Sequence, residues 1–222
     1  MSPTYIILAL IVAVVDWVAI QLRNKPLEFI AKPGVMILLL IGLWQASSFQ
    51  GPMIWFGLGL LFSMAGDIFL MLPKEQFIPG LVSFLIAHLA YLVGFNQSPP
   101  PMILASLVLV VMVGITAVQL YRRLAGGLRA SGQTRLIYPV MAYSVVISLM
   151  LISALMTLAR AEWSEGPALL VSAGALLFFL SDSFLGWNKF VAPLPYGKLR
   201  VIVTYHLGQI LIVLGAAFHF LA

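Results

Sequence analysis

Cysteine is absent from the 222 residues of this chain. Disulfides, thiolate metal ligands and a cysteine nucleophile are therefore excluded. Several familiar motifs are also missing: there is no Gly-x-Ser-x-Gly elbow, no His-Glu-x-x-His helix, no phosphate-binding glycine loop and no dinucleotide fingerprint. A serine lipase or an ATP-driven pump is therefore poorly supported.

Charged residues are scarce. They make up 9% of the chain, hydrophobic residues make up 62%, and the mean hydropathy is +1.08, whereas soluble domains carry about 25% charged residues. A membrane crossing needs about 20 apolar residues, so the length leaves room for about eight helices and for no soluble domain. The sequence predicts an all-α transmembrane bundle that forms a single domain over residues 1–222.

Apolar runs place these spans along the chain. The predicted spans are Thr4–Leu22, Pro33–Phe49, Pro52–Leu72, Phe77–Asn96, Met102–Tyr121, Leu136–Leu158, Pro167–Trp187 and Val201–Leu221. Proline and glycine mark the joins, and the pair Lys32-Pro33 is expected to open the second span.

Basic residues are concentrated in the turns after the first, third, fifth and seventh spans, whereas the other side holds only Arg160. This asymmetry predicts that the basic turns are cytoplasmic and that both termini lie on the opposite side. The net charge of +5 is accordingly interpreted as a topology signal and not as a nucleic-acid surface. A bacterial inner membrane is the simplest expected location, and the oligomeric state is left open.

A weak internal repeat relates the two halves. Asp67-Ile-Phe-Leu in the third span resembles Asp182-Ser-Phe-Leu in the seventh, and His88-Leu-Ala-Tyr91 resembles His206-Leu-Gly-Gln209. Spans that are four apart run in the same direction, so this pattern indicates a parallel four-plus-four repeat.

Asp16, Asp67 and Asp182 are the acids that lie inside the predicted spans. A carboxylate at membrane depth costs several kcal/mol unless it faces the bundle interior. Asp67 and Asp182 fall at similar depths near the basic end, so the two are expected to meet. Asp16 is expected to be solvated at the interface.

Other polar residues are expected to converge near this pair: Lys32 at the start of the second span, and Tyr138, Tyr143, Tyr205, His206 and Gln209. His88 and Tyr91 are expected deeper, near mid-membrane or beyond. Their simplest role is to join helices by hydrogen bonds. A zinc site built from Asp67, His88, Asp182 and His206 is chemically feasible, although the spacing does not demand one.

The chain resembles the lysoplasmalogenase, or YhhN, family of small eight-helix membrane proteins. The resemblance rests on an ordered set of short matches over most of the chain: Lys32-Pro33, Ser63-Met-Ala-Gly66-Asp67 with Phe77 and Gly80, Phe84 to Tyr91, Phe178 to Asp182, and Thr204-Tyr205 with Gln209. His206 stands where the pattern expects an aromatic residue, which leaves its role in doubt.

The resemblance implies hydrolysis of the vinyl-ether bond of lysoplasmalogens to a fatty aldehyde and a glycerophospho-alcohol, with a lysophospholipid as substrate. We expect no cofactor and no metal, with the zinc site as the alternative. Acid hydrolysis of a vinyl ether needs a proton donor and a group that stabilises the cation or activates water. A pair of carboxyls can divide these roles.

We therefore expect Asp67 and Asp182 to be catalytic. Lys32, His88, Tyr91, Tyr143, Tyr205 and Gln209 are the expected substrate-binding residues. A proton-coupled transporter is the alternative, because it also places acids inside a bundle, but its helices are expected to be broken at mid-membrane. A lipid-binding scaffold without catalysis is the third interpretation.

Overall fold

The computed structural model describes residues 1–72, 74, 76–101 and 103–221, which form α-helices, two 3-10 turns and loops. The long helices are α1 (Pro3–Gln21), α2 (Lys25–Ser47), α3 (Met53–Met71), α4 (Phe77–Phe95), α5 (Leu104–Ala130), α6 (Ile137–Met156), α7 (Glu165–Phe190) and α8 (Gly197–Phe220). All eight of these described helices, α6 together with its flanking 3-10 turns, are long and apolar enough to cross a membrane. The predicted all-α bundle is confirmed. The predicted start of the fifth span, Met102, lies outside the described residues.

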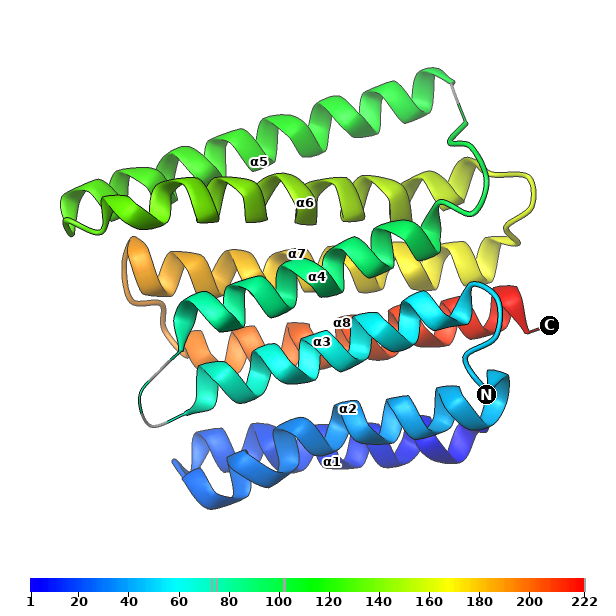
Figure 1. Ribbon diagram of the computed structural model, residues 1–222, viewed down its shortest axis with the longest axis horizontal. Helices are drawn as coiled ribbons and strands as arrows, with labels where there is room; N and C mark the ends of the chain where they lie inside the picture. The colour runs from blue at the N-terminus through cyan, green and yellow to red at the C-terminus, as the bar shows by residue number, and fades with distance from the viewer. Residues whose placement is uncertain (73, 75, 102, 222) are drawn as a thin grey trace.

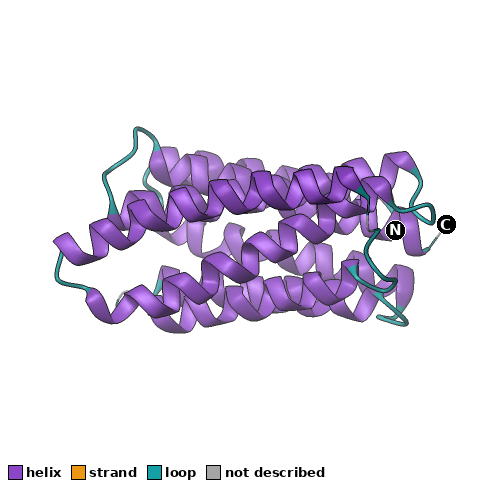
Figure 2. Cartoon of the chain, turned by 90° about the horizontal axis from the view of Figure 1, so that it is seen from above, coloured by secondary structure: helices purple, strands orange, loops and turns teal. Residues whose placement is uncertain are grey.

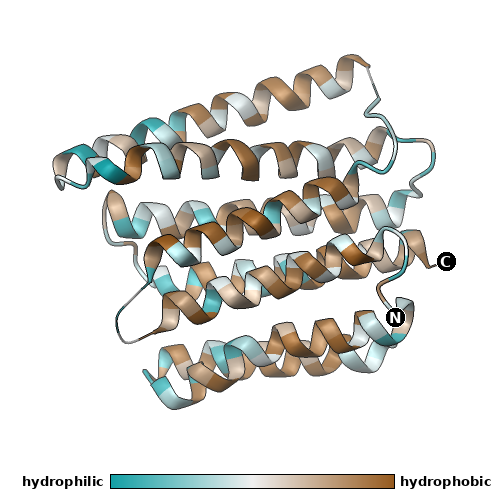
Figure 3. Cartoon of the chain, viewed as in Figure 1, coloured by the Kyte–Doolittle hydropathy of each residue, from teal (hydrophilic) through white to brown (hydrophobic). Residues whose placement is uncertain are grey.

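The helices run up and down along one common axis, and the loops lie at the two ends of the bundle (Figures 1 and 2). Both termini lie at one end. The turns after α1, α3, α5 and α7 lie at the other end, where hydrophilic residues gather (Figure 3). This arrangement matches the separation of basic turns from termini that the sequence predicted; which end is cytoplasmic stays a prediction.

The expected start of the second span at Pro33 was wrong, because α2 begins at Lys25 and contains Pro33. The helix starts where the Asn24 side chain accepts a hydrogen bond from Leu27 N. Pro33 has no N–H for the helical bond to the Phe29 carbonyl, a loss that membrane helices tolerate. As a result Glu28 and Lys32 lie one helical turn apart on the same face of α2.

Helix α5 also extends further than predicted, to Ala130 instead of Tyr121. Its last turns are helical because Leu124 and Leu128 are buried against Val140 of α6 and Phe190 of α7. The arginines of this segment, Arg122, Arg123 and Arg129, therefore lie on the helix and not in a turn.

Arg160, the basic residue at the end with the termini, has a structural role. It is 5% exposed, and its Nη1 donates to the carbonyls of Phe95 and Ser98, both at 3.0 Å. Its Nη2 donates to Asn96 Oδ1 at 2.8 Å. Burial lowers the pKa of this guanidinium. Arg160 thus stabilises the end of α4 and the residues that follow it. This structural role explains why one basic residue lies at the end of the bundle that otherwise lacks them.

Helices α7 and α8 approach each other closely at a pair of glycines. A Cβ on Gly174 would lie 2.8 Å from Gly208 O and 2.7 Å from Ile212 N. Main-chain atoms cannot move aside as a flexible side chain can, so this contact requires glycine. The close contact holds α7 beside α8.

Replacing Gly174 by alanine should lower the free energy of unfolding by about 1–3 kcal/mol, the usual cost of overpacking. Gly114→Ala is the matched control, because a Cβ on Gly114 meets nothing within 4 Å and alanine favours a helix. Thermal unfolding of the two detergent-solubilised variants checks this. Equal stability of the two would contradict the close contact.

Candidate active site

Asp67 lies in the last turns of α3, is 1% exposed, and is held from two sides. Lys32 Nζ of α2 lies 2.9 Å from Asp67 Oδ1. The hydroxyl of Tyr205, on α8, donates to Asp67 Oδ2 at 2.6 Å. The ammonium group balances the charge of a carboxylate that would be costly to bury alone.

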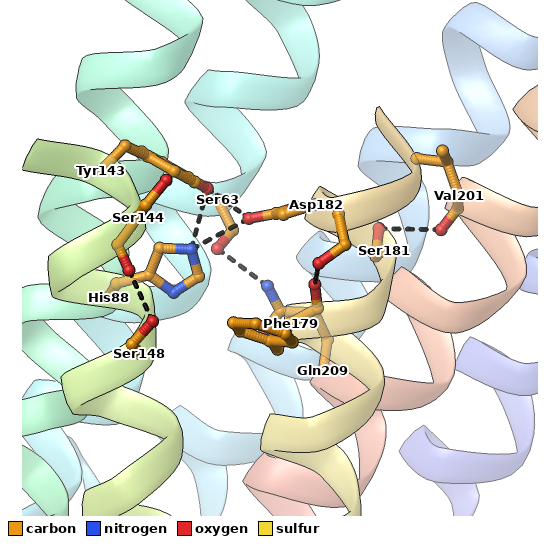
Figure 4. A network of polar contacts seen from close by, with 11 residues as sticks. Ser63, His88, Tyr143, Ser144, Ser148, Phe179, Ser181, Asp182, Val201 and Gln209 are labelled. Carbon is orange, nitrogen blue, oxygen red and sulfur yellow. Dashed lines mark hydrogen bonds and ion pairs between the residues drawn. The ribbon is translucent and has the colours of Figure 1, made fainter. Parts of the chain in front are cut away.

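Asp182 on α7 is the centre of a second cluster (Figure 4). The hydroxyl of Tyr143, on α6, donates to Asp182 Oδ2. His88 Nε2 of α4 lies 3.1 Å from the same oxygen and 2.9 Å from the Tyr143 hydroxyl. The Asp182 side chain is 10% exposed and that of Asp67 is 2% exposed, so Asp182 is the more accessible carboxyl.

The two clusters correspond to each other when the halves of the chain are compared. Asp67 of α3 is held from α2 and α8, whereas Asp182 of α7 is held from α6 and α4. Helices α2, α3 and α8 of the first set are each four places away from α6, α7 and α4 of the second set. The helices that hold the two carboxyls are therefore related as in a parallel four-plus-four repeat, but the residues are not, because Tyr205 holds Asp67 where the repeat in the sequence matches His88 with His206. The repeat itself stays a prediction.

Both aspartates line one cavity of about 540 Å³, which we call the polar cavity. Its lining comes from α1, α2, α3, α4, α7 and α8 and carries charges of both signs. The charged residues that line it are Lys25, Glu28, Lys32, Asp67, Asp182, Lys189 and Lys198. Tyr205 lines it too. The predicted convergence of the two carboxyls on one space is thus observed, although each has its own partners.

A second, narrower space of about 60 Å³, which we call the apolar groove, meets the polar cavity at Asp182. Its walls come from α3, α4, α5, α6 and α7. The residues that line it are Leu70, Phe77, Leu81, Phe84, Ala117, Leu120, Leu124, Val140, Tyr143, Ser144, Ile147, Ser148, Phe179, Asp182, Ser183, Leu185, Gly186 and Phe190. Leu70, Phe84, Asp182 and Leu185 line both spaces.

Tyr91 and Gln209 lie behind the aspartates and hydrogen-bond to each other. The Tyr91 hydroxyl donates to Gln209 Oε1 at 2.5 Å, and Gln209 Nε2 donates to Ser63 Oγ at 2.8 Å. The fully buried ring of Phe178 packs between the clusters, with its centroid 4.5 Å from that of His88 and 5.4 Å from that of Tyr205. The Tyr91 ring also packs against Phe178, with centroids 6.4 Å apart, so Tyr91 and Gln209 support the Phe178 ring that separates the two clusters.

The sequence did not predict that Lys25, Glu28 and Lys198 line the polar cavity. Glu28 lies between two lysines, 3.1 Å from Lys25 Nζ and 3.5 Å from Lys198 Nζ. Glu28 was placed outside the second span because Pro33 was taken as its start. An available signal was the spacing of Glu28 and Lys32, which are four residues apart.

Two expectations about single residues were wrong. Asp16 is fully buried instead of solvated, because Ala9, Ala13, Asp16 and Ala19 form the packed stripe of α1. Tyr138 is 74% exposed and does not reach the site.

His206 serves the packing of α1 on α8, since its Nδ1 accepts from Trp17 Nε1 at 3.2 Å. It therefore does not join Asp67, His88 and Asp182. Over the part of the chain that the structure describes, no group of three His, Asp or Glu residues could hold a metal ion.

Comparison with known proteins gives matches to one family of proteins. The model of the YhhN family matches residues 27–216. The chain is 32% identical to lysoplasmalogenase TMEM86A of Homo sapiens, over 71% of the chain and 63% of that protein. It is 29% identical to lysoplasmalogenase TMEM86B of Mus musculus, over 90% of the chain and 76% of that protein. The chain thus spans less than two thirds of the first relative. No solved structure matches it significantly.

Proposed function

The chain belongs to the YhhN family, and from this membership we propose that it is a membrane-embedded hydrolase of lysoplasmalogen-type lysophospholipids. It cleaves the vinyl-ether bond and releases a fatty aldehyde and a glycerophospho-alcohol. The observation that carries the proposal is the pair of buried carboxyls, Asp67 and Asp182, on one cavity at the basic end of the bundle. The relatives named lysoplasmalogenase support the substrate class.

The reaction begins with protonation of the alkene carbon, and Asp182 is the proposed proton donor. Asp182 has the more exposed carboxyl, and its Oδ2 is occupied by Tyr143 and His88. Its other oxygen, Oδ1, can then carry the proton toward substrate. Protonation converts the vinyl ether into an oxocarbenium ion, in which the positive charge is shared between carbon and the ether oxygen.

Asp67 is the proposed partner that stabilises this cation and activates water. Its charge is already balanced by Lys32 and its position is fixed by Tyr205. Water adds to the cationic carbon and loses a proton to give a hemiacetal, which then collapses to the aldehyde and the free glycerol hydroxyl. This division of work between two carboxyls follows general acid–base catalysis.

The remaining expected residues have supporting roles in this proposal. An ammonium group has three donors, so Lys32 can hold Asp67 and also contact a phosphate oxygen in the cavity that it lines. His88 and Tyr143 orient Asp182. Tyr91 and Gln209 support Phe178, which packs against Tyr205. We further propose that this end of the bundle faces the cytoplasm, as the basic turns predict.

The continuity of the helices supports hydrolysis over transport. Asp67, His88, Asp182 and Tyr205 lie on α3, α4, α7 and α8, each of which is a single unbroken helix. Transporter sites near mid-membrane are typically built from discontinuous helices.

The direct test is aldehyde release from a lysoplasmalogen by the purified protein in detergent. The alkyl-ether and acyl-ester analogues of the same lipid serve as controls, and a chelator-treated sample runs beside them. We expect release from the vinyl ether alone, unchanged by the chelator. A folded protein that releases no aldehyde would refute this substrate and favour transport; loss of release with the chelator would favour a metal.

A further inference from the structure

Two spaces meet at Asp182, one apolar and one lined by charged residues. A single-chain phospholipid likewise has one apolar end and one charged end. The polar cavity, about 540 Å³, is lined by lysines and acids, whereas the apolar groove, about 60 Å³, is lined mostly by aliphatic and aromatic side chains. Asp182 is a lining residue of both. A molecule that passes from one space to the other therefore passes the proposed proton donor.

We propose that the apolar groove holds the part of the substrate's hydrocarbon chain next to the reacting bond and the polar cavity its glycerophospho headgroup, so that the reacting bond lies at Asp182. This inference rests on the proposed function. It adds where each part of the substrate binds and where the hydrocarbon chain of the lipid leaves the protein. The hydrocarbon chain extends sideways between α4 and α5 into the bilayer.

The lateral position of the groove supports this path. Its α4 wall includes Leu81 and its α5 wall includes Ala117. The next residues on these helices, Val82 and Val118, are 46% and 57% exposed. Apolar residues that are exposed on a membrane helix face lipid, so the groove is flanked by surface that contacts hydrocarbon. A chain in the groove can continue into the membrane without crossing a polar layer.

Two packed aromatic rings cover the end of the groove nearest the basic loops. The rings of Phe77 and Phe190 pack edge to face there, with centroids 5.4 Å apart. Lys189 Nζ lies 4.8 Å from the centre of the Phe77 ring. The hydrocarbon chain is therefore directed toward the bilayer and away from the aqueous end of the bundle.

The mouth of the polar cavity is suited to the other end of the lipid. Glu28 lies between Lys25 and Lys198, whose side chains are 61% and 62% exposed. A zwitterionic headgroup carries one phosphate and one ammonium, which match the lysines and Glu28 respectively. Charges on this side exclude a second hydrocarbon chain, so the single groove fits a lipid with one chain.

Narrowing the groove tests the proposal. Ala117→Trp is expected to lower kcat/KM for a long-chain lysoplasmalogen by about tenfold or more, because the indole ring would fill space that the hydrocarbon chain needs. A short-chain, water-soluble analogue should be affected much less, and an unchanged unfolding temperature shows that the variant is folded. Val118→Trp, one residue away and facing lipid, is the matched control and should leave both rates unchanged.

A crosslinking measurement keeps the test independent of turnover. A non-hydrolysable alkyl lysophospholipid with a diazirine on the chain close to the ether oxygen should label groove residues of α4, α5 and α6, such as Leu81, Ala117 and Ile147. Labelling confined to outer residues such as Val118 would overturn the proposed path, as would equal rates for Ala117→Trp and wild type on the long chain. A wild-type protein that cleaves neither chain length but is labelled in the groove would instead refute the proposed hydrolysis alone.

Discussion

Asp182→Asn should lower the rate of aldehyde release by about 10²–10⁴-fold, the range that a general acid contributes. An asparagine can still hydrogen-bond to Tyr143 and His88, so the bundle should remain folded while the transferable proton is lost. The rate of aldehyde formation from a lysoplasmalogen, measured on protein with an unchanged unfolding temperature, checks this.

The chain offers a matched control for that variant. Asp16 is another aspartate of a membrane helix; it is fully buried and lines neither the polar cavity nor the apolar groove. Asp16→Asn should therefore retain most of the activity. If Asp182→Asn kept the wild-type rate, Asp182 would not be the acid, and the lipid-binding interpretation without catalysis would gain support.

Lys32→Met should destabilise the protein by about 3–5 kcal/mol, the cost of leaving one partner of a buried ion pair uncompensated. Lys32 Nζ lies 2.9 Å from Asp67 Oδ1, and their side chains are only 14% and 2% exposed. Activity should fall as well, because Asp67 loses the cation that balances its charge. Thermal unfolding and aldehyde release are measured on the same preparation.

The double variant Lys32→Met with Asp67→Asn separates stability from catalysis. Removing the charge of Asp67 should restore most of the stability lost in Lys32→Met, since no unpaired carboxylate then remains. Activity should stay low, because the carboxylate itself is missing. A double variant that is less stable than Lys32→Met would show that the ion pair is not the dominant interaction of Lys32.

The number and nature of the helices could be predicted from the sequence because apolar runs of membrane length are a strong signal. Their ends were less predictable. Pro33 indicated a helix start but lies inside α2, since a membrane helix tolerates the lost hydrogen bond. The last turns of α5 are polar on one side, and the buried Leu124 and Leu128 that stabilise them make contacts only in the folded bundle.

The candidate site was predictable as a set of residues but not as a geometry. The cost of a charge in the membrane singled out Asp67 and Asp182, and both do line one cavity. Which polar residue holds which carboxyl depends on how the helices rotate, so the sequence could not assign Lys32 to Asp67 or Tyr143 to Asp182. For the same reason the burial of Asp16 was missed.

Hydrolysis in deuterium oxide tests most directly the central claim, that a protein carboxyl protonates the alkene carbon of a vinyl ether. The aldehyde, trapped at once by reduction, should carry one deuterium on the carbon next to the carbonyl carbon. Wild-type protein and Asp16→Asn should give this product, whereas Asp182→Asn should give almost none. Aldehyde without deuterium at that carbon, or undiminished labelled aldehyde from Asp182→Asn, would contradict the account.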